Sequence, residues 1–234
     1  MNDATVEALR LLLAGDPALW DIVGVSFRVS LTALALAVPP GLALAALLAF
    51  GRFPGRRLLV SVFNAMLSIP AVVVGLVFYL LLSRHGPLGE WRLLFTQTAM
   101  VLGQIALSLP IVVAMTHTAL QELDPRAWET GRTLGAGHLR TALTLMSEVR
   151  YALLAAVIAA FGRIIAEVGS AMMLGGNILG YTRNITTAIA LETSKGAYAQ
   201  GIALGLVLLL LAFLLNSGLH WLQGRSRLQP EYLA

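Results

Sequence analysis

The sequence predicts an all-α, polytopic membrane protein with about five transmembrane helices. Of its 234 residues, 58% are hydrophobic and 12% are charged, whereas soluble domains average roughly 45–50% apolar and 25% charged residues. The mean hydropathy is +0.80. Long apolar runs separated by short polar connectors favour one helical membrane domain over a soluble fold. Cysteine is absent, which excludes disulfides, thiolate metal sites and cysteine nucleophiles.

Five stretches are long enough to cross a membrane, which takes about 20 mostly apolar residues. They are residues 26–50, 58–82, 95–119, 151–173 and 200–222. We expect one transmembrane domain over 23–223, preceded by a short segment, 1–22, and followed by a tail, 224–234. The apolar block Leu11 to Ala14 is too short for the core of a signal peptide. Insertion is therefore expected to use the mature helices.

Prolines lie near the middle of the first three predicted spans. They are Pro39, Pro40, Pro70 and Pro110. Proline removes a backbone donor and kinks a helix, which a membrane bundle tolerates when neighbours satisfy the freed carbonyl. We therefore expect helix kinks at these positions. They fit ordinary bundle packing, and they equally fit helices along a route that changes shape during transport.

The connectors predict which ends of the spans face the cytoplasm. Basic residues are concentrated in alternate connectors: Arg52, Arg56 and Arg57 in the first, four arginines in 121–150, and Arg225 and Arg227 in the tail. Cytoplasmic loops carry an excess of lysine and arginine. The N-terminus is therefore expected outside and the C-terminus in the cytoplasm.

Segment 121–150 is the polar interruption between the third and fourth spans. Asp124 followed by Pro125 is typical of a helix start, so we expect a helix over 125–134. A flexible turn at Gly135–Gly137 follows, in which the second glycine can take the left-handed backbone that ends a helix, and a further helix starts near His138. Four side chains are then available to a partner, although a solvated connector is the alternative: Arg126, Glu129, Arg132 and Thr133.

The run from Glu129 to Ala136, ETGRTLGA, resembles the EAA-loop signature of permease subunits of ATP-binding-cassette importers, a glutamate followed six residues later by Gly-Ala. Thr130 and Gly131 depart from the usual pair of alanines, and 145–148 departs from the usual Ile-x-Leu-Pro. Segment 163–169, RIIAEVG, looks like the fourth-span motif of molybdate, sulfate and tungstate permeases. Segments 175–178 and 186–196 are most similar to tungstate permeases.

This resemblance covers residues 22–223 and implies the type I permease fold of a prokaryotic inner membrane protein. In that family the protruding loop is a coupling helix that docks on the ATPase subunit, which adds Gly135 and Ala136 to the four docking candidates. It further implies a homodimer in membrane lipid, two ATPase subunits that hold ATP-Mg, and an extracytoplasmic binding protein that delivers an oxyanion, with tungstate preferred over molybdate and sulfate.

Arg163 and Glu167 lie four residues apart in the fourth predicted span, so they are expected on one helical face. Charge in hydrocarbon costs at least about 2.5 kcal/mol per residue on insertion scales, so both should face the bundle interior and find partners. They form either a structural ion pair or part of the oxyanion path, which would also include Gly169 and Ser170.

Segment 174–199 is expected at the outer mouth, with a short helix over 186–194 capped by Thr186 or Thr187. Its polar residues are candidates for contact with the delivering protein, or simply members of a polar loop: Asn177, Arg183, Glu192 and Lys195.

Several activities are disfavoured by what the sequence lacks. No Gly-x-x-x-x-Gly-Lys-Ser/Thr loop occurs, so ATP hydrolysis by that route is excluded and no cofactor is expected on this chain. The four histidines have no metal-ligand spacing, and nucleic acid is not an expected partner. The alternatives are an ion-coupled secondary transporter, a membrane enzyme and a membrane anchor. The first needs ionisable residues on several spans, and the second needs clustered acids or histidines.

Overall fold

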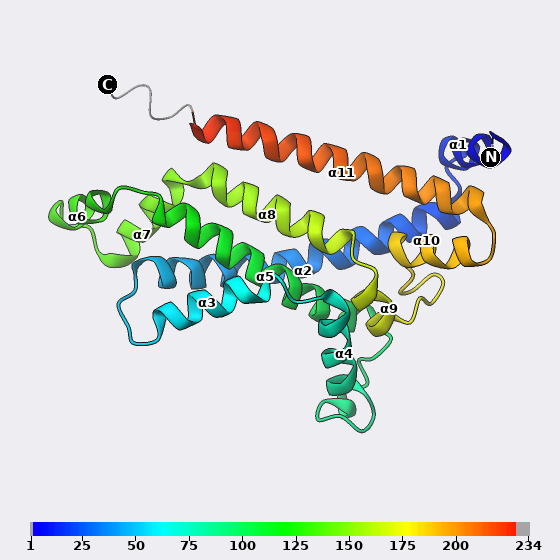
Figure 1. Ribbon diagram of the computed structural model, residues 1–234, viewed down its shortest axis with the longest axis horizontal. Helices are drawn as coiled ribbons and strands as arrows, with labels where there is room; N and C mark the ends of the chain where they lie inside the picture. Colours follow the sequence, from blue (N-terminus) through cyan, green and yellow to red (C-terminus); the bar gives the residue numbers. More distant parts are fainter. Residues whose placement is uncertain (1, 228–234) are drawn as a thin grey trace.

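The computed structural model describes residues 2–227, and within that range the chain is helical without strands (Figure 1). The elements are α1 (Asn2–Ala14), α2 (Pro17–Phe50), α3 (Arg56–Met66), α4 (Ala71–Leu82), the 3-10 helix η1 (Gly89–Trp91), α5 (Gln97–Gln121), α6 (Pro125–Thr133), α7 (His138–Glu148), α8 (Arg150–Ile165), α9 (Gly169–Gly175), α10 (Ile185–Ser194) and α11 (Tyr198–Arg227).

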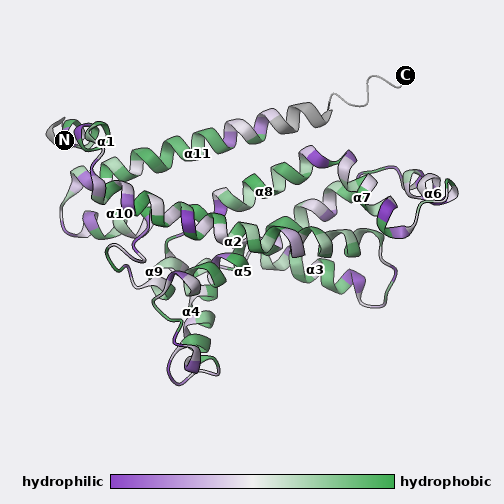
Figure 2. Cartoon of the chain, turned by 180° about the vertical axis from the view of Figure 1, so that it is seen from behind, coloured by the Kyte–Doolittle hydropathy of each residue, from purple (hydrophilic) through white to green (hydrophobic). Residues whose placement is uncertain are grey.

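Three helices, α2, α5 and α11, are each long and apolar enough to cross a membrane. Two bent pairs, α3 with α4 and α7 with α8, raise the total to five if each pair is one span. Hydrophobic residues dominate α2, α5, α8 and the first two thirds of α11 (Figure 2). The prediction of an all-α membrane protein with about five spans is confirmed.

The second predicted span, 58–82, is not one helix. It is divided into α3 and α4, which meet at an angle of 103°. Pro70 caps the start of α4 instead of kinking a continuous helix, because proline disfavours helical backbone in the residue before it and has no N–H to donate. By contrast, α2 continues through Pro39 and Pro40, and α5 through Pro110.

The fourth predicted span, 151–173, is also broken. Its helix α8 ends at Ile165, and α9 starts after three residues that lie outside both helices. At its other end α8 is bent by 74° from α7. Segment 1–22 holds α1 and the start of α2, and α11 continues to Arg227, so the predicted tail begins inside a helix. Residues 228–234 of that tail lie outside the described part of the chain.

The core lies between α2, α5, α8 and α9. Val29, Met100 and Ile164 are buried there. Small residues permit the close approach of these helices: a Cβ atom on Gly103 would lie 2.5 Å from Leu174 Cδ1, closer than packed atoms come. Small residues at helix contacts are typical of membrane bundles, where close backbone packing replaces the hydrophobic driving force. Helix α9 therefore rests directly on α5.

The molecule has two distinct ends along its long axis (Figure 1). Helices α6 and α7 and the turn between α2 and α3 lie at one end. Helices α1 and α10 lie at the opposite end, with the loop between α9 and α10 near them. Helix α4 projects sideways from the bundle. The predicted docking loop and the predicted outer segment are thus at opposite ends of the long helices.

Candidate functional site

The first candidate site is the helical hairpin formed by α6 and α7. Asp124 accepts a hydrogen bond from the Arg126 amide at 2.9 Å and so caps α6, as predicted from the Asp-Pro pair. Gly135 adopts the left-handed backbone with φ +86°, whereas Gly137 is extended at φ −67° and caps α7. The left-handed residue is therefore the first glycine of the turn and not the second. Helix α6 ends at Thr133, one residue before its predicted end, and Gly135 follows it after Leu134.

The two helices of the hairpin touch at Gly131. A Cβ atom at this position would lie 2.8 Å from Thr141 Cγ2, and Thr141 is 2% exposed. Thr141 also donates a hydrogen bond to the Gly137 carbonyl at 3.1 Å. Gly131 is one of the two departures from the EAA-loop signature, and the packing of Thr141 gives it a physical reason.

Trp128 attaches the hairpin to the membrane helices. Its ring stacks on Phe50, the last residue of α2, with centroids 4.6 Å apart and planes at 19°. On another side it meets His138 at 6.1 Å. An offset aromatic pair contributes about 0.5–1.5 kcal/mol beyond the area it buries. Helix α6 is thereby in contact with the end of a spanning helix. The one tryptophan in a charged segment was the signal that sequence analysis passed over.

The predicted docking residues gather on the exposed side of α6. Glu129, Arg132 and Thr133, together with Trp128 and Arg52, line a cavity of about 610 Å³. Arg132 donates to the Ala136 carbonyl at 2.7 Å, which holds the turn closed. Arg126 and Glu129 are exposed, and among the described residues neither side chain has an ion-pair partner. The hairpin therefore presents unpaired charge around a hollow.

The second candidate site is the break between α8 and α9. Glu167 Oε2 accepts a hydrogen bond from Arg163 Nη1 at 2.7 Å, and Glu167 Oε1 accepts one from the Gly169 amide at 2.8 Å and a longer one from the Ser170 amide at 3.4 Å. The backbone carbonyl of Glu167 accepts from Thr186 at 2.7 Å. The predicted ion pair is confirmed, although Glu167 lies beyond the end of α8 and not on its helical face.

Side chains satisfy the backbone at this break, which is required where non-helical chain lies at membrane depth. Gln104 of α5, which is 2% exposed, donates to the Ile164 carbonyl at 3.3 Å. Gly169 fits closely, because a Cβ atom there would lie 2.5 Å from Val72 Cγ2. Arg163 remains 43% exposed in its side chain while Glu167 is 9% exposed. The carboxylate is thus used internally, and the guanidinium keeps free donors.

The third candidate site is the outer segment, where the four predicted residues form one cluster. Arg183 Nε donates to Asn177 Oδ1 at 3.2 Å and Arg183 Nη1 lies 3.9 Å from Glu192 Oε1. Lys195 Nζ donates to the same Glu192 oxygen at 3.0 Å. The side chains of Arg183 and Glu192 are only 15% and 9% exposed. They tie the loop to α10, and of the four only Lys195 is exposed.

Helix α10 starts one residue earlier than predicted and has a different cap. Asn184 Oδ1 accepts from the Thr187 amide at 2.9 Å, and Thr187 Oγ1 accepts from the Asn184 amide at 3.1 Å. The prediction that Thr186 or Thr187 is the cap is wrong, because Asn184 is the cap; Thr187 completes a capping box with it, and Thr186 donates to the Glu167 carbonyl. Large exposed side chains in the preceding loop were not singled out from the sequence: Ile178, Leu179 and Tyr181.

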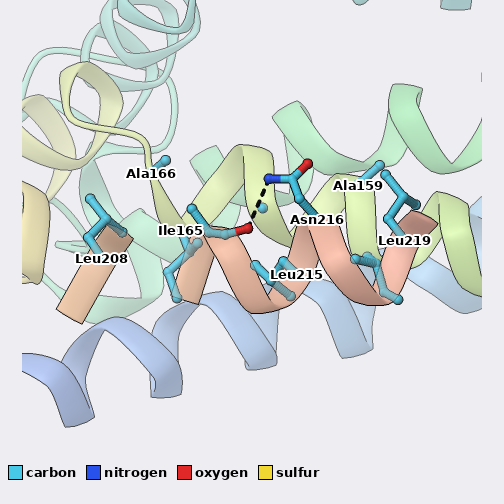
Figure 3. Close-up of a pocket in the computed structure, with 10 residues that line it drawn as sticks. Ala159, Ile165, Ala166, Leu208, Leu215, Asn216 and Leu219 are labelled. Atoms are coloured by element: carbon cyan, nitrogen blue, oxygen red, sulfur yellow. Dashed lines mark hydrogen bonds between the residues drawn. The ribbon is translucent and has the colours of Figure 1, made fainter. Parts of the chain in front are cut away.

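A groove between α8 and α11 is a feature of the apolar surface that sequence analysis did not anticipate (Figure 3). It encloses about 310 Å³ and is lined by small and branched apolar residues of both helices. Its amide side chain, Asn216, donates to the Ala212 carbonyl of its own helix at 2.9 Å. No titratable residue lines this groove, so it adds nothing to the charged sites above.

Comparison with known proteins decides the family. Residues 37–228 match the family described as the inner membrane component of binding-protein-dependent transport systems. The chain belongs to this family. It is therefore a permease of an ATP-binding-cassette transporter and an inner membrane protein.

Three similar proteins carry names that specify tungstate or molybdenum. A tungstate uptake permease protein of Peptoclostridium acidaminophilum is 40% identical, over 92% of this chain and 95% of its own. One of Campylobacter jejuni is 42% identical, over 94% and 92%. A molybdenum transport permease protein of Escherichia coli is 31% identical, over 92% and 98%.

A solved structure shows the same fold. It is a bacterial ATP-binding-cassette transporter that imports the acidic polysaccharide alginate, and the match has a TM-score of 0.67 and 17% identity. The alignment covers 88% of this chain and 78% of the other. The likeness confirms the ABC permease architecture.

Proposed function

We propose that this chain forms the membrane route of an oxyanion importer, with tungstate as the transported anion and ATP hydrolysis on a partner subunit. The α6–α7 hairpin carries the proposal. It projects from one end of the spanning helices, exposes Arg126 and Glu129 without ion-pair partners among the described residues, and is joined to α2 through Trp128. Of these two charges, Glu129 lines the hollow. Identity of about 40% to tungstate permeases over nearly the whole chain supports the choice of anion.

The proposed orientation puts the hairpin end in the cytoplasm and the N-terminus outside. Arg52 lies in the turn between α2 and α3, and Arg56 and Arg57 are the first residues of α3. This turn is at the same end of the molecule as the hairpin (Figure 1), and an excess of arginine is typical of cytoplasmic connectors. The outer cluster around Arg183 would then meet the binding protein, with exposed Lys195, Ile178 and Tyr181 as its contact residues.

In the proposed route, Arg163 supplies the fixed positive charge and Glu167 holds it in place. The Glu167 carboxylate is occupied by Arg163 and by the start of α9. Arg163 uses one Nη1 donor there, and a guanidinium has five. Gly169 and Ser170 place the backbone of α9 beside this arginine. A weak site of this kind suits transport, because an anion must leave as readily as it enters.

The proposed assembly contains two copies of this chain and two ATPase subunits. Each copy has one docking hairpin, and symmetric oligomers repeat a single interface. Helix α3 has no buried residue in the isolated chain, and α4 exposes Val72, Leu76 and Leu80. A second copy against these helices would give them a partner.

Glu129→Ala tests the docking role. The full chain is purified with its ATPase partner in lipid nanodiscs, and ATP hydrolysis is measured with and without the loaded binding protein. We expect loss of stimulated hydrolysis, because Glu129 is exposed on the docking side of α6 and its side chain has no partner among the described residues. Glu90→Ala, an exposed glutamate in η1, is the matched control. Full stimulation in Glu129→Ala would contradict the docking assignment.

The anion is tested by titrating the cognate binding protein by calorimetry with tungstate, molybdate and sulfate. Tight binding of tungstate with weaker molybdate supports the proposal. Preference for sulfate or molybdate would reassign the anion while leaving the permease role intact. Uptake that persists without the ATPase and stops with an uncoupler would instead favour an ion-coupled transporter.

A further inference from the structure

We propose that the turn between α2 and α3 holds the phosphate of an anionic phospholipid. A cavity of about 410 Å³ is lined by Gly51, Arg52, Phe53, Gly55, Arg56 and Arg57. Its walls include three arginines and no acidic residue: Arg52, Arg56 and Arg57. Arginine binds phosphate with paired N–H donors and is held less strongly by water than lysine, so the composition of this cavity specifies an anion of phosphate type.

Arg56 is the arginine of the cavity whose guanidinium is held in place by hydrogen bonds. Its Nε donates to the Leu48 carbonyl, and its Nη2 donates to the Ala49 carbonyl at 3.3 Å. These bonds satisfy the last carbonyls of α2 and hold the guanidinium in place, while Nη1 keeps its donors. A guanidinium that is already positioned loses less entropy when it binds an anion.

Arg52 and Arg57 are the two arginines of the cavity whose guanidinium groups are not held by the protein. Both are exposed, and in the described chain neither makes an ion pair or side-chain hydrogen bond. The first-turn amides of α3 lie beside them. Those amides have no intrahelical acceptor, and Gly55, which caps this helix, offers no side chain to them. The cavity thus has more N–H donors than the described protein has acceptors for.

The surroundings of the cavity favour a lipid over an acidic protein surface. Exposed apolar side chains lie on both sides of it along the chain: Leu47 in α2 is 53% exposed, and Leu58 and Leu59 in α3 are 69% and 42% exposed. Charge followed at once by exposed apolar surface matches the boundary between headgroups and acyl chains. A phospholipid would place its phosphate among the arginines and its chains along α3.

Native mass spectrometry of the full chain tests the site, with phosphatidylglycerol and phosphatidylcholine of identical acyl chains as probes. Basic residues near anionic lipid are each worth a severalfold change in affinity. Arg52→Gln with Arg57→Gln should therefore weaken phosphatidylglycerol binding about tenfold or more and leave phosphatidylcholine binding unchanged. Arg56 is kept because it caps α2. The control, Arg84→Gln with Arg140→Gln, removes two exposed arginines outside the cavity.

Three outcomes would overturn the proposal. Equal weakening in the control pair would mean that binding follows net charge and not this cavity. Complete displacement of phosphatidylglycerol by inorganic phosphate would assign the site to a free anion. Unchanged lipid binding with loss of ATPase assembly would make the turn a protein contact. None of these outcomes depends on the anion that is transported. Because Arg52 also lines the cavity beside α6, the single variant Arg57→Gln, whose residue does not line that cavity, separates failure of lipid binding from failure of docking.

Discussion

The two ends of the molecule use the same types of charged residue in opposite ways. At the α6–α7 end, Arg126 and Glu129 are exposed and unpaired within the described structure. At the α10 end, Arg183 and Glu192 are largely buried and bound to each other, to Asn177 and to Lys195. Charge that is already paired holds loops in place, whereas unpaired charge remains available to another protein.

The difference follows from burial. A buried charge needs partners because removing one partner leaves the other desolvated and unpaired, which costs several kcal/mol. An exposed charge keeps its water, and a surface pair contributes little. The break between α8 and α9 belongs with the buried class, because Glu167 is 7% exposed as a residue. Substitution of a buried charge should therefore lower the stability of the protein. Substitution of an exposed charge should weaken docking and leave stability unchanged.

The largest effect is expected for Glu167→Ala. It would leave Arg163 unpaired and remove the acceptor for the Gly169 amide. The free energy of unfolding should therefore fall by about 3 kcal/mol. The apparent Tm in detergent should fall strongly. Glu167→Gln is the matched variant, because its amide oxygen can still accept from α9 and its loss should be smaller. An unchanged Tm in Glu167→Ala would contradict the internal role of this residue.

Glu192→Ala should have the second largest effect and lower the free energy of unfolding by about 2 kcal/mol, because it removes the shared partner of Arg183 and Lys195. Lys195→Ala is its control. Lysine 195 has a side chain that is 51% exposed, so we expect almost no change in Tm. If both variants melted alike, the outer cluster would be a surface feature and the comparison of the two ends would be wrong.

Gly131→Ala should lower the Tm by a smaller amount, corresponding to about 1–2 kcal/mol, because the new methyl group overlaps Thr141. The double variant Gly131→Ala with Thr141→Ser sharpens the test. It deletes Thr141 Cγ2 and keeps the hydroxyl that donates to Gly137. Recovery of the Tm in the double variant would assign the loss to this single contact, and failure to recover would exclude it.

The smallest effect on stability is expected for Arg126→Ala. Its guanidinium is exposed and unpaired, so the Tm should not change measurably. Stimulated ATP hydrolysis with the partner subunit should fall, since this residue is on the docking side of α6. A large drop in Tm would show that Arg126 is structural and would remove the contrast between the two ends.

Much of the docking hairpin was predictable because its signals are local. Asp124 with Pro125 predicted the start of α6, and the glycines predicted a turn before α7. The choice between Gly135 and Gly137 was not predictable, since either can be left-handed and the length of α6 decides. Trp128 was missed because its partner, Phe50, is distant in sequence.

The broken spans were the main failure of sequence analysis. Residues 58–82 and 151–173 are apolar throughout or nearly so, and hydropathy measures transfer into lipid and not backbone continuity. Pro70 indicated a disturbance but not a bend of 103°. The break at 166–168 has no proline, and it persists because Glu167, Gln104 and Thr186 satisfy its backbone.

The sequence by itself determined that the chain is a helical membrane protein, where its charged hairpin lies, and that Arg163 and Glu167 pair. These properties depend on composition and on residues within a few positions of one another. Only the tertiary structure decided where spans break, which charges are buried, and which remain for a partner. Those outcomes depend on contacts between distant segments, such as Glu167 with Thr186 and Phe50 with Trp128, and no local pattern specifies them.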